Sequence, residues 1–290
     1  MPALLDRDVG PGVFRAATVN VWGFFGDWPA RRALLDSLLG QLAADVLLVQ
    51  EACVADGEDQ IDDLREASGL EYAAVGRPHG VVGHAEGVGI LSRWPLLDVR
   101  VEPLPRSEPA RCMLAARLSA PAAPLWLVCA HTAFAPQYVC EEQIQMLAGA
   151  AGPVSLLGGD LNATPDLVHP IVQPAGYRDA LSDLQATWPA DDDSFRWAWQ
   201  EKTGRTVSFD TTPRRLDYLL ARGCDVTASG VIIPGDQQVG FASDHAVVWA
   251  DVTLAGREDT VASRRSRTRA HIQGARDAAD RLAAVDLRGG

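Results

Sequence analysis

The sequence predicts an α+β protein in which two mostly antiparallel sheets pack face to face, with helices on the outside. Short strand-like runs dominate the chain, and Pro- and Gly-rich turns separate them between residues 71 and 132. Amphipathic stretches such as 31–42 interrupt the strands and carry leucines at helical spacing. A parallel, doubly wound sheet fits about the first hundred residues but not the strand–turn–strand run after them, so the sandwich is favoured.

The pattern of apolar residues places the elements along the chain. We expect helices at 31–42, 59–68 and 137–148, the second closed by Gly69. Strands are expected at 14–22, 45–51, 71–75, 87–92, 113–118, 125–132, 154–160, 216–220 and 243–252. Residues 166–210 form a long mixed region with an acidic cluster at 191–193 and three tryptophans. These tryptophans, Trp188, Trp197 and Trp199, are expected in the core, although they could stack on a base or an acyl chain.

Composition limits the class of protein. The 290 residues are 47% hydrophobic and 22% charged, as in soluble globular proteins, and the chain lacks an apolar stretch long enough to cross a bilayer. The N-terminus lacks the layout of a signal peptide, so we expect a cytoplasmic protein. The net charge of −12 works against loose attraction to DNA or anionic membranes. The five cysteines are an odd number without a Cys-x-x-Cys pair, which indicates neither a disulfide framework nor a zinc site.

The chain is predicted to consist of three segments. An N-terminal extension at 1–13 precedes a catalytic domain at 14–255, and an arginine-rich tail follows at 256–290. The tail has too little apolar surface for a core, so we expect it to be solvated, and partly helical or disordered. A basic arm that binds an anionic partner is the alternative. The protein is expected to be a monomer.

A stretch near the middle of the chain, 154–165, combines a buried strand with polar side chains at its end. Gly158 and Gly159 loosen the backbone before Asp160 and Asn162, and a proline stops the run. Because side chains alternate along extended backbone, Asp160 and Asn162 should share one side while Leu161 turns into the core. This arrangement suits a pocket for a phosphate or a metal, and a strand that runs into an Asx-type turn is the plain structural alternative.

Polar residues also mark the other apolar runs. A single one means little, but the whole set indicates strand ends that converge on one site. The set contains Asn20, Glu51, His131, Asp160, Asn162, Asp217, Asp244 and His245. Oxygen ligands without cysteine favour a hard cation such as Mg²⁺ or Mn²⁺, whereas zinc would want more histidine or cysteine.

These residues belong to short motifs that follow one another in a fixed order. The motifs are Thr-Val-Asn-Val-Trp at 18–22, Gln-Glu at 50–51, Glu-Gly-Val-Gly-Ile-Leu-Ser-Arg at 86–93, Gly-Asp-Leu-Asn at 159–162, Arg-Leu-Asp-Tyr at 215–218 and Ser-Asp-His at 243–245. Over residues 14–252 the chain resembles the endonuclease/exonuclease/phosphatase superfamily. That superfamily includes deoxyribonuclease I, AP endonucleases, neutral sphingomyelinases and inositol-phosphate 5-phosphatases. The resemblance implies a four-layered α/β/β/α sandwich, in agreement with the strand pattern.

The resemblance also implies a metal site. Glu51 is similar to the family's main metal-binding carboxylate, with Asn20 beside it. Asp244 is similar to a further carboxylate on the metal side. The cation would sit on the scissile phosphate, neutralise developing charge and help the leaving oxygen depart.

Catalytic roles follow from the same resemblance. Asp160 is similar to the group that orients or deprotonates the attacking water, and Asn162 to one that holds a phosphate oxygen. His245 is similar to the catalytic histidine, and Asp217 to the carboxylate that fixes its tautomer and supports its charged form. His131 is similar to the second histidine of the deoxyribonuclease I and sphingomyelinase branches, which argues against abasic-site repair. A buried core histidine is the alternative for His131.

Substrate contacts are predicted at two further positions. Arg111 resembles a phosphate-contacting arginine, and its forked guanidinium suits phosphate oxygens, although a surface charge is the alternative. Glu86 precedes an apolar strand and either lies on the substrate side or is solvated. The remaining histidines lack such a context and are expected in loops: His79, His84 and His169.

The function predicted from these residues is Mg²⁺-dependent (or Mn²⁺-dependent) hydrolysis of a phosphodiester or a small phosphorylated metabolite, by in-line attack of water. The substrate could be a phosphorylated small molecule, a lipid headgroup or a nucleic acid, without stable insertion into a membrane. A nuclease that holds nucleic acid with the arginine-rich tail is the first alternative. A catalytically silent or specialised biosynthetic protein on the same fold is the second.

Overall fold

The computed structural model describes residues 12–55, 57–78, 86–106, 108–119, 124–183, 185–236 and 240–254. The predicted arginine-rich tail and most of the predicted N-terminal extension lie outside these residues, as do His79 and His84. The division into three segments therefore stays a prediction, and all that follows concerns the described part of the predicted catalytic domain.

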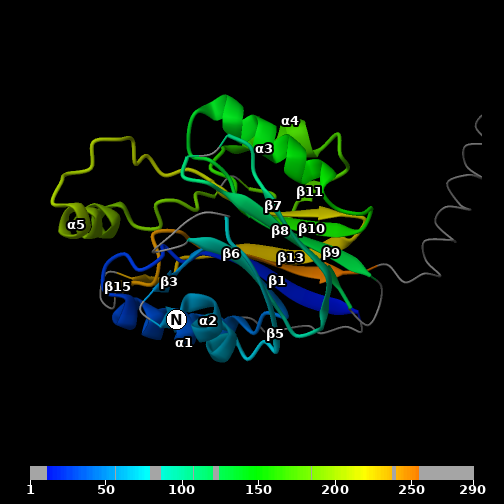
Figure 1. The fold of residues 1–290 in the computed structure, drawn as a ribbon, viewed down its shortest axis with the longest axis horizontal. Coiled ribbons are helices and arrows are strands. Elements are labelled where there is room, and N and C mark those ends of the chain that lie inside the picture. The colour runs from blue at the N-terminus through cyan, green and yellow to red at the C-terminus, as the bar shows by residue number, and fades with distance from the viewer. Residues whose placement is uncertain are drawn as a thin grey trace, which may run out of the picture. The chain divides into compact units, whose positions relative to one another are not determined.

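Two six-stranded sheets form the centre of this domain (Figure 1). The strands of the first sheet are, from edge to edge, β13 (Asp225–Ile232), β16 (Val247–Thr253), β1 (Val13–Asn20), β2 (Val46–Ala52), β6 (Gly87–Ser92) and β5 (Tyr72–Gly76). Those of the second are β11 (Arg178–Asp179), β12 (Asp217–Arg222), β10 (Ser155–Asp160), β9 (Leu125–His131), β8 (Cys112–Leu118) and β7 (Leu96–Pro103). Only β1 with β2 and β9 with β10 are parallel within these sheets. The predicted mostly antiparallel sheets are confirmed.

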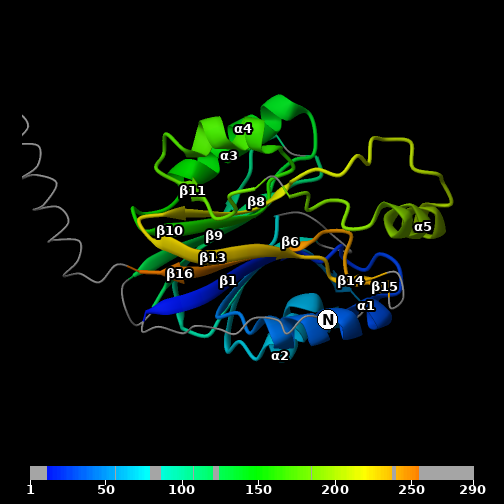
Figure 2. The same ribbon diagram turned by 180° about the vertical axis from the view of Figure 1, so that it is seen from behind.

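Helices form the outer layers of the sandwich (Figure 1). The first sheet is covered by α1 (Trp28–Leu42) and α2 (Gln60–Ser68), and the second by α3 (Gln137–Gly149) and α4 (Pro165–Val172). Two short ladders pair β3 (Val54–Ala55) with β4 (Glu58–Asp59) and β14 (Gly235–Asp236) with β15 (Gly240–Phe241). Figure 2 shows α5 (Asp192–Thr203) away from the sheets, at the end where the β14–β15 ladder lies. The predicted four-layered sandwich is confirmed.

Local sequence signals fix the ends of the helices. The carboxylate of Asp59 accepts the backbone N–H of Ile61 at 2.9 Å and caps α2, which ends at Gly69 in the left-handed conformation. Asp27 caps α1 in the same way, and Pro29 lies in its first turn. This cap explains why α1 begins before residue 31, where the leucine spacing alone had placed it.

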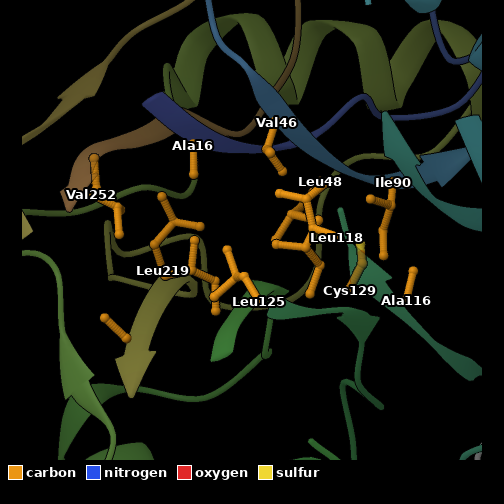
Figure 3. Close-up of a cluster of buried hydrophobic side chains, with 14 of the residues drawn as sticks. Ala16, Val46, Leu48, Ile90, Ala116, Leu118, Leu125, Cys129, Leu219 and Val252 are labelled. Carbon is orange, nitrogen blue, oxygen red and sulfur yellow. The ribbon is translucent and has the colours of Figure 1, made fainter. Parts of the chain in front are cut away.

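The space between the sheets is filled by small and branched apolar side chains. Figure 3 shows Ala16, Val46 and Leu48 of the first sheet facing residues of the second, among them Cys129 and Leu219. Strand β1 is buried along almost its whole length because its alternate residues pack under α1 and α2. All five cysteines are buried and free.

Residues 166–210 are more regular than the sequence indicated. The segment contains α4 and α5, so the prediction that His169 lies in a loop was wrong: it is in α4, with its ring 2.8 Å from the Asp179 carboxylate. Strands β7 and β13 were not predicted from the sequence either. Both are edge strands with mostly exposed or half-buried side chains, which weakens the apolar signal of a buried strand. Within the described residues, the structure contains no helix of the length and apolarity that a membrane crossing requires.

A buried ion pair ties the start of β1 to β16. Arg15 is 2% exposed, and its Nε and Nη2 donate to the two carboxylate oxygens of Asp251 at 2.7 and 2.8 Å. The guanidinium also lies over the ring of Trp249, with 4.7 Å to the ring centroid. Removing one partner would leave the other charge buried without compensation.

We therefore expect Asp251→Asn to lower the free energy of unfolding by about 3 kcal/mol, the lower end of the range for a broken buried pair. Chemical denaturation measures this change. Asp225→Asn is the matched control, because Asp225 pairs with Arg178 at 2.7 Å but both side chains are largely exposed. That control should lose less than about 1 kcal/mol. Equal losses in the two variants would contradict the importance of the buried pair.

Candidate active site

Three polar residues lie side by side at the ends of neighbouring strands in the second sheet. Asp160 of β10 is in register with His131 of β9 on one side and with Asp217 of β12 on the other. The close approach of β9 requires Gly159, which has φ +141°, because a Cβ there would overlap the carbonyl oxygen of Ala130. Gly159 is therefore needed for its positive φ and for the close approach of β9, where the sequence had indicated only a loosened backbone.

The first sheet contributes Asn20 and Glu51 from the ends of the parallel strands β1 and β2. Glu51 lies in a bulge of β2 and has φ +57°, a conformation that non-glycine residues seldom adopt. Asn20 Nδ2 donates to Glu51 Oε1 at 2.9 Å and to Asp160 Oδ2 at 3.2 Å, while its Oδ1 accepts the backbone N–H of Trp22. Asn20 thus links the polar ends of the two sheets.

The Ser243–Asp244–His245 sequence precedes β16 and reaches the same place. The Ser243 hydroxyl donates to the backbone oxygen of Asn20 at 2.6 Å and accepts the backbone N–H of His245 at 3.1 Å. His245 Nδ1 is 2.9 Å from Asp217 Oδ2, and its Nε2 is 3.6 Å from Asp160 Oδ2. The predicted pairing of His245 with Asp217 is present in the structure.

Arg111 and Glu86 lie next to His131. Arg111 Nη1 is 2.6 Å from His131 Nδ1 and 3.1 Å from Glu86 Oε2. Because a guanidinium can only donate, Nδ1 of His131 is the acceptor and its ring proton is on Nε2. That Nε2 lies 3.4 Å from Asp160 Oδ2 and 3.8 Å from Glu51 Oε1.

Asn162 completes the set in a conformation that the sequence did not indicate. Its φ is +45°, so the chain has left the extended conformation two residues after Asp160. Its backbone N–H donates to Asp160 Oδ1 at 2.9 Å, and its Nδ2 donates to the Thr132 carbonyl oxygen. Leu161 between them is fully buried, as expected, and Asp160 and Asn162 line one cavity.

Burial and mutual repulsion act strongly on the carboxylates. Burial, with the nearby charges of Glu86 and Asp244, raises the pKa of Glu51 to about 8. Burial and the charge of Asp217 raise the pKa of Asp160 to about 6, although His245 opposes the shift. Burial likewise raises the pKa of Asp244. Each carboxyl group is thus easier to protonate than in water. A cation bound nearby would stabilise the charged carboxylates in place of a proton.

The two histidines have opposite electrostatic environments. Burial, together with the charges of Arg111 and His245, lowers the pKa of His131 well below its usual value. Burial acts in the same direction on His245, but the carboxylates of Asp217, Asp160 and Asp244 outweigh it and raise its pKa well above the usual value. At neutral pH His131 is therefore neutral and His245 is positively charged.

Sequence reasoning missed the residues that hold the loops of the site. Arg31 of α1 is 6% exposed, and its guanidinium donates to the carbonyl oxygens of Val21, Gly23, Phe25 and Ala242 at 2.6–2.8 Å. It therefore connects the loop after Asn20 with the loop before Ser243. In an amphipathic helix such an arginine resembles any surface charge, so the sequence carries no signal for this role.

Two further residues were missed in the segment before β12. The Thr187 hydroxyl accepts the backbone N–H groups of Leu216 and Asp217 at 3.0 and 3.1 Å. Trp188 Nε1 donates to Asp244 Oδ2 at 3.0 Å. A tryptophan bonded to a strand-end carboxylate could be suspected from sequence only if the fold of the long segment were already known.

A cavity of about 330 Å³ brings most of the predicted site residues together. Those that line it are Glu51, Glu86, Arg111, His131, Asp160, Asn162, Asp244 and His245. Asn20 and Asp217 are buried beside it and contact its lining residues. Ligand atoms of Glu51, His131 and Asp160 lie within 4.8 Å of one another, as do those of Asp160, Asp217 and His245, which is close enough for each group to hold a metal ion.

Comparison with known proteins agrees with this geometry. A family model described as the Endonuclease/Exonuclease/phosphatase family matches residues 17–245. The search of curated proteins returned no match.

Solved structures share the fold. TDP2 of D. rerio, complexed with single strand DNA product, is 17% identical with a TM-score of 0.67, over 83% of this chain and 99% of that chain. An endonuclease/exonuclease/phosphatase from Beutenbergia cavernae is 22% identical with a TM-score of 0.64, over 84% of this chain and 72% of that one. A protein of the same family from Leptotrichia buccalis is 17% identical with a TM-score of 0.64, over 82% and 98%. At these identities the likeness concerns the fold.

The raised pKa of Glu51 predicts a pH-dependent stability. A carboxyl whose folded pKa is above its unfolded value stabilises the fold when protonated, and this contribution is lost as the pH rises from about 4.5 to about 8. We therefore compare the free energy of unfolding of Glu51→Gln with that of the parent protein in EDTA. The difference should shift in favour of the variant by on the order of 1 kcal/mol between pH 5 and pH 8. Chemical denaturation at the two pH values measures the difference.

Metal binding is tested on the same variant. Mn²⁺ should raise the melting temperature of the parent protein at pH 8 but not that of Glu51→Gln, which lacks the charged ligand. Glu66→Gln is the matched control, because the Glu66 side chain is 82% exposed, and it should behave like the parent in both experiments. The same Mn²⁺ shift in Glu51→Gln would reject Glu51 as a ligand.

Proposed function

Since the chain belongs to the endonuclease/exonuclease/phosphatase family and is a metal-dependent phosphoester hydrolase, we propose that it hydrolyses a phosphodiester or a small phosphorylated metabolite. Mg²⁺ is the proposed cation, with Mn²⁺ as a substitute, and water is the proposed nucleophile in an in-line displacement. The observation that carries the proposal is a single cavity that joins Glu51, Asp160 and His245. We keep the predictions of a cytoplasmic location and a monomer as part of this proposal.

The residues around Glu51 fit a hard divalent cation. Their donors are carboxylate oxygens, and a cation would relieve the repulsion among Glu51, Glu86 and Asp244 that raises the pKa of Glu51. We assign Glu51 as the direct ligand, Asn20 as the residue that holds its carboxylate, and Asp244 as a further carboxylate on the metal side. Bound Mg²⁺ would neutralise charge on the phosphate and assist the leaving oxygen.

Asp160 is the proposed acceptor of the proton of the attacking water. Its pKa of about 6 lies near neutral pH, where a general base is most effective. The backbone N–H of Asn162 fixes one carboxylate oxygen, and Asn20 donates to the other. The Asn162 amide has a second N–H beyond the one bonded to Thr132, and we propose that it contacts a phosphate oxygen.

The histidines and Arg111 are the proposed donors to the phosphate. Asp217 holds Nδ1 of His245, so the charged ring presents Nε2–H to the cavity and stabilises negative charge there. Neutral His131 presents its own Nε2–H, because Arg111 occupies Nδ1. Arg111 lines the cavity and is placed to contact the phosphate directly.

Hydrolysis of nucleic acid is the alternative activity. The observation that favours it is the shared fold with D. rerio TDP2, whose structure contains single strand DNA product. The net charge of −12 opposes it, because non-specific binding to DNA depends on positive charge. Nucleic acids therefore belong among the test substrates.

A hydrolysis panel tests the proposal. Plasmid DNA, single-stranded DNA, RNA, sphingomyelin and small phosphomono- and diesters are incubated with Mg²⁺, with Mn²⁺ and with EDTA. We expect metal-dependent turnover, and His245→Ala should lower kcat by about 10²–10⁴ because it removes a proton donor to the transition state.

His169→Ala is the matched control. This histidine of α4 pairs with Asp179 of β11 and is not among the residues that line the cavity. It should retain the parent rate. Turnover that persists in EDTA, or in folded His245→Ala at the parent rate, would refute the proposed mechanism.

A further inference from the structure

The cavity of the active site has an aromatic wall beside its polar residues. The rings that line it are Trp22, Phe25, Phe134, Trp188, Phe195, Trp199 and Phe209. Four of these rings belong to residues 188–209, which connect β11 with β12 and include α5. Aromatic rings offer large flat surfaces at a small loss of conformational freedom, and such surfaces bind other flat rings well.

Contacts among the rings hold the wall in place. Phe195 lies 5.4 Å from Trp188 and 6.1 Å from Trp199, measured between ring centroids, and Trp199 lies 5.3 Å from Phe209 at an interplanar angle of 85°. Trp188 in turn lies 6.4 Å from the ring of His245. The wall therefore reaches from solvent-facing Phe209 to the catalytic histidine in a chain of neighbouring rings.

The outer part of the wall is exposed to water. Phe209 is 37% exposed and Phe134, which follows β9, is 63% exposed, whereas Trp188 and Phe195 are buried. Large apolar groups that remain exposed at the mouth of a cavity are typical of surfaces that a ligand covers. The exposed rings thus mark the end of the wall at which a substituent of the substrate would lie.

The charges around the cavity limit how many phosphates can bind. Among the described residues that line it, Arg111 is the only arginine or lysine, and it is accompanied by Glu51, Glu86, Asp160 and Asp244. A polyanion such as duplex DNA binds through many cationic contacts along its backbone. A ligand with one phosphate, whose further binding energy comes from ring stacking, fits this lining better.

From these observations we infer that the substrate is a phosphodiester with a single phosphate and a flat aromatic substituent. The substituent stacks on the face of Trp199 or Phe209 and meets the other ring edge-on, because the two rings are nearly perpendicular. This inference rests on the proposed function, because it places the phosphate of that substrate over Asp160 and His245. Nucleobases and simple aryl groups share the required chemistry. Rings on a protein wall bind stacked bases with a strength that corresponds to a change in affinity of roughly five- to 150-fold for each ring.

Binding of non-hydrolysable probes tests the inference without turnover. Benzyl(methyl)phosphinate and cyclohexylmethyl(methyl)phosphinate each carry one negative charge and two stable P–C bonds, and they differ only in whether the ring is flat. Calorimetry with Mg²⁺ present should show at least about tenfold tighter binding of the benzyl probe. A phosphinate in which C5′ of 5′-deoxythymidine replaces the benzyl carbon then distinguishes a nucleobase from a simple aryl group by which of the two binds more tightly.

Variants assign the effect to the wall. Trp199→Leu and Phe209→Leu keep an apolar side chain but remove a flat ring, so each should reduce the preference for the benzyl probe at least about fivefold. Trp197→Leu is the matched control, because Trp197 is 65% exposed in the same helix and does not line this cavity. Near-UV circular dichroism checks that each variant keeps its fold.

Equal affinity for the two ring types in the parent protein, or an unchanged preference in folded Trp199→Leu and Phe209→Leu, would overturn the inference. These outcomes are separate from failure of the proposed hydrolysis. A protein that binds the benzyl probe tightly but turns over no substrate in the panel would keep the aromatic subsite and lose the proposed reaction.

Discussion

The hydrogen bond from Asn20 to Asp160 connects the two sheets at the ends of β1 and β10. Its formation depends on how the sheets are packed, since a Cβ on Gly158 of β10 would lie 2.7 Å from Leu48 Cδ1 of β2. It also depends on strand register, because a shift of β10 by one residue would turn Asp160 into the helix-side core. The alignment of Asp160 with His131 and Asp217 thus follows from the register within the second sheet, and its contact with Asn20 follows from the packing of the two sheets.

This packing concentrates negative charge in a buried place. The carboxylates of Glu51, Asp160 and Asp244 are all easier to protonate than in water, so the site favours a cation, a proton or the charged ring of His245. Burial of like charges reduces stability, and the hydrogen bonds from Asn20 to Glu51 and from Trp188 to Asp244 hold these groups in spite of it. The cation that we propose for this site would offset this negative charge and allow an anionic phosphate to bind beside it.

The fold class and the residues at the strand ends could be predicted from the sequence. Polar residues at the ends of apolar strands are conspicuous, and motif order identified Glu51, Asp160 and His245 as neighbours in space. Arg31 could not be found in this way, because it acts on main-chain carbonyl oxygens that are alike in every sequence. Thr187 was missed because its hydroxyl accepts main-chain N–H groups, which are equally alike in every sequence. The wall around Trp199 depends on tertiary contacts of a long connection, which periodicity does not reveal.

Titration of Mn²⁺ into the metal-free protein tests most directly whether the buried carboxylates form a cation site. Calorimetry at pH 7 in two buffers of different ionisation enthalpy measures the protons released on binding. Because Glu51 has a pKa of about 8, it is largely protonated at this pH without metal, and we predict the release of close to one proton. Binding without proton release, or no binding to the folded protein, would contradict the assignment of Glu51 as a metal ligand.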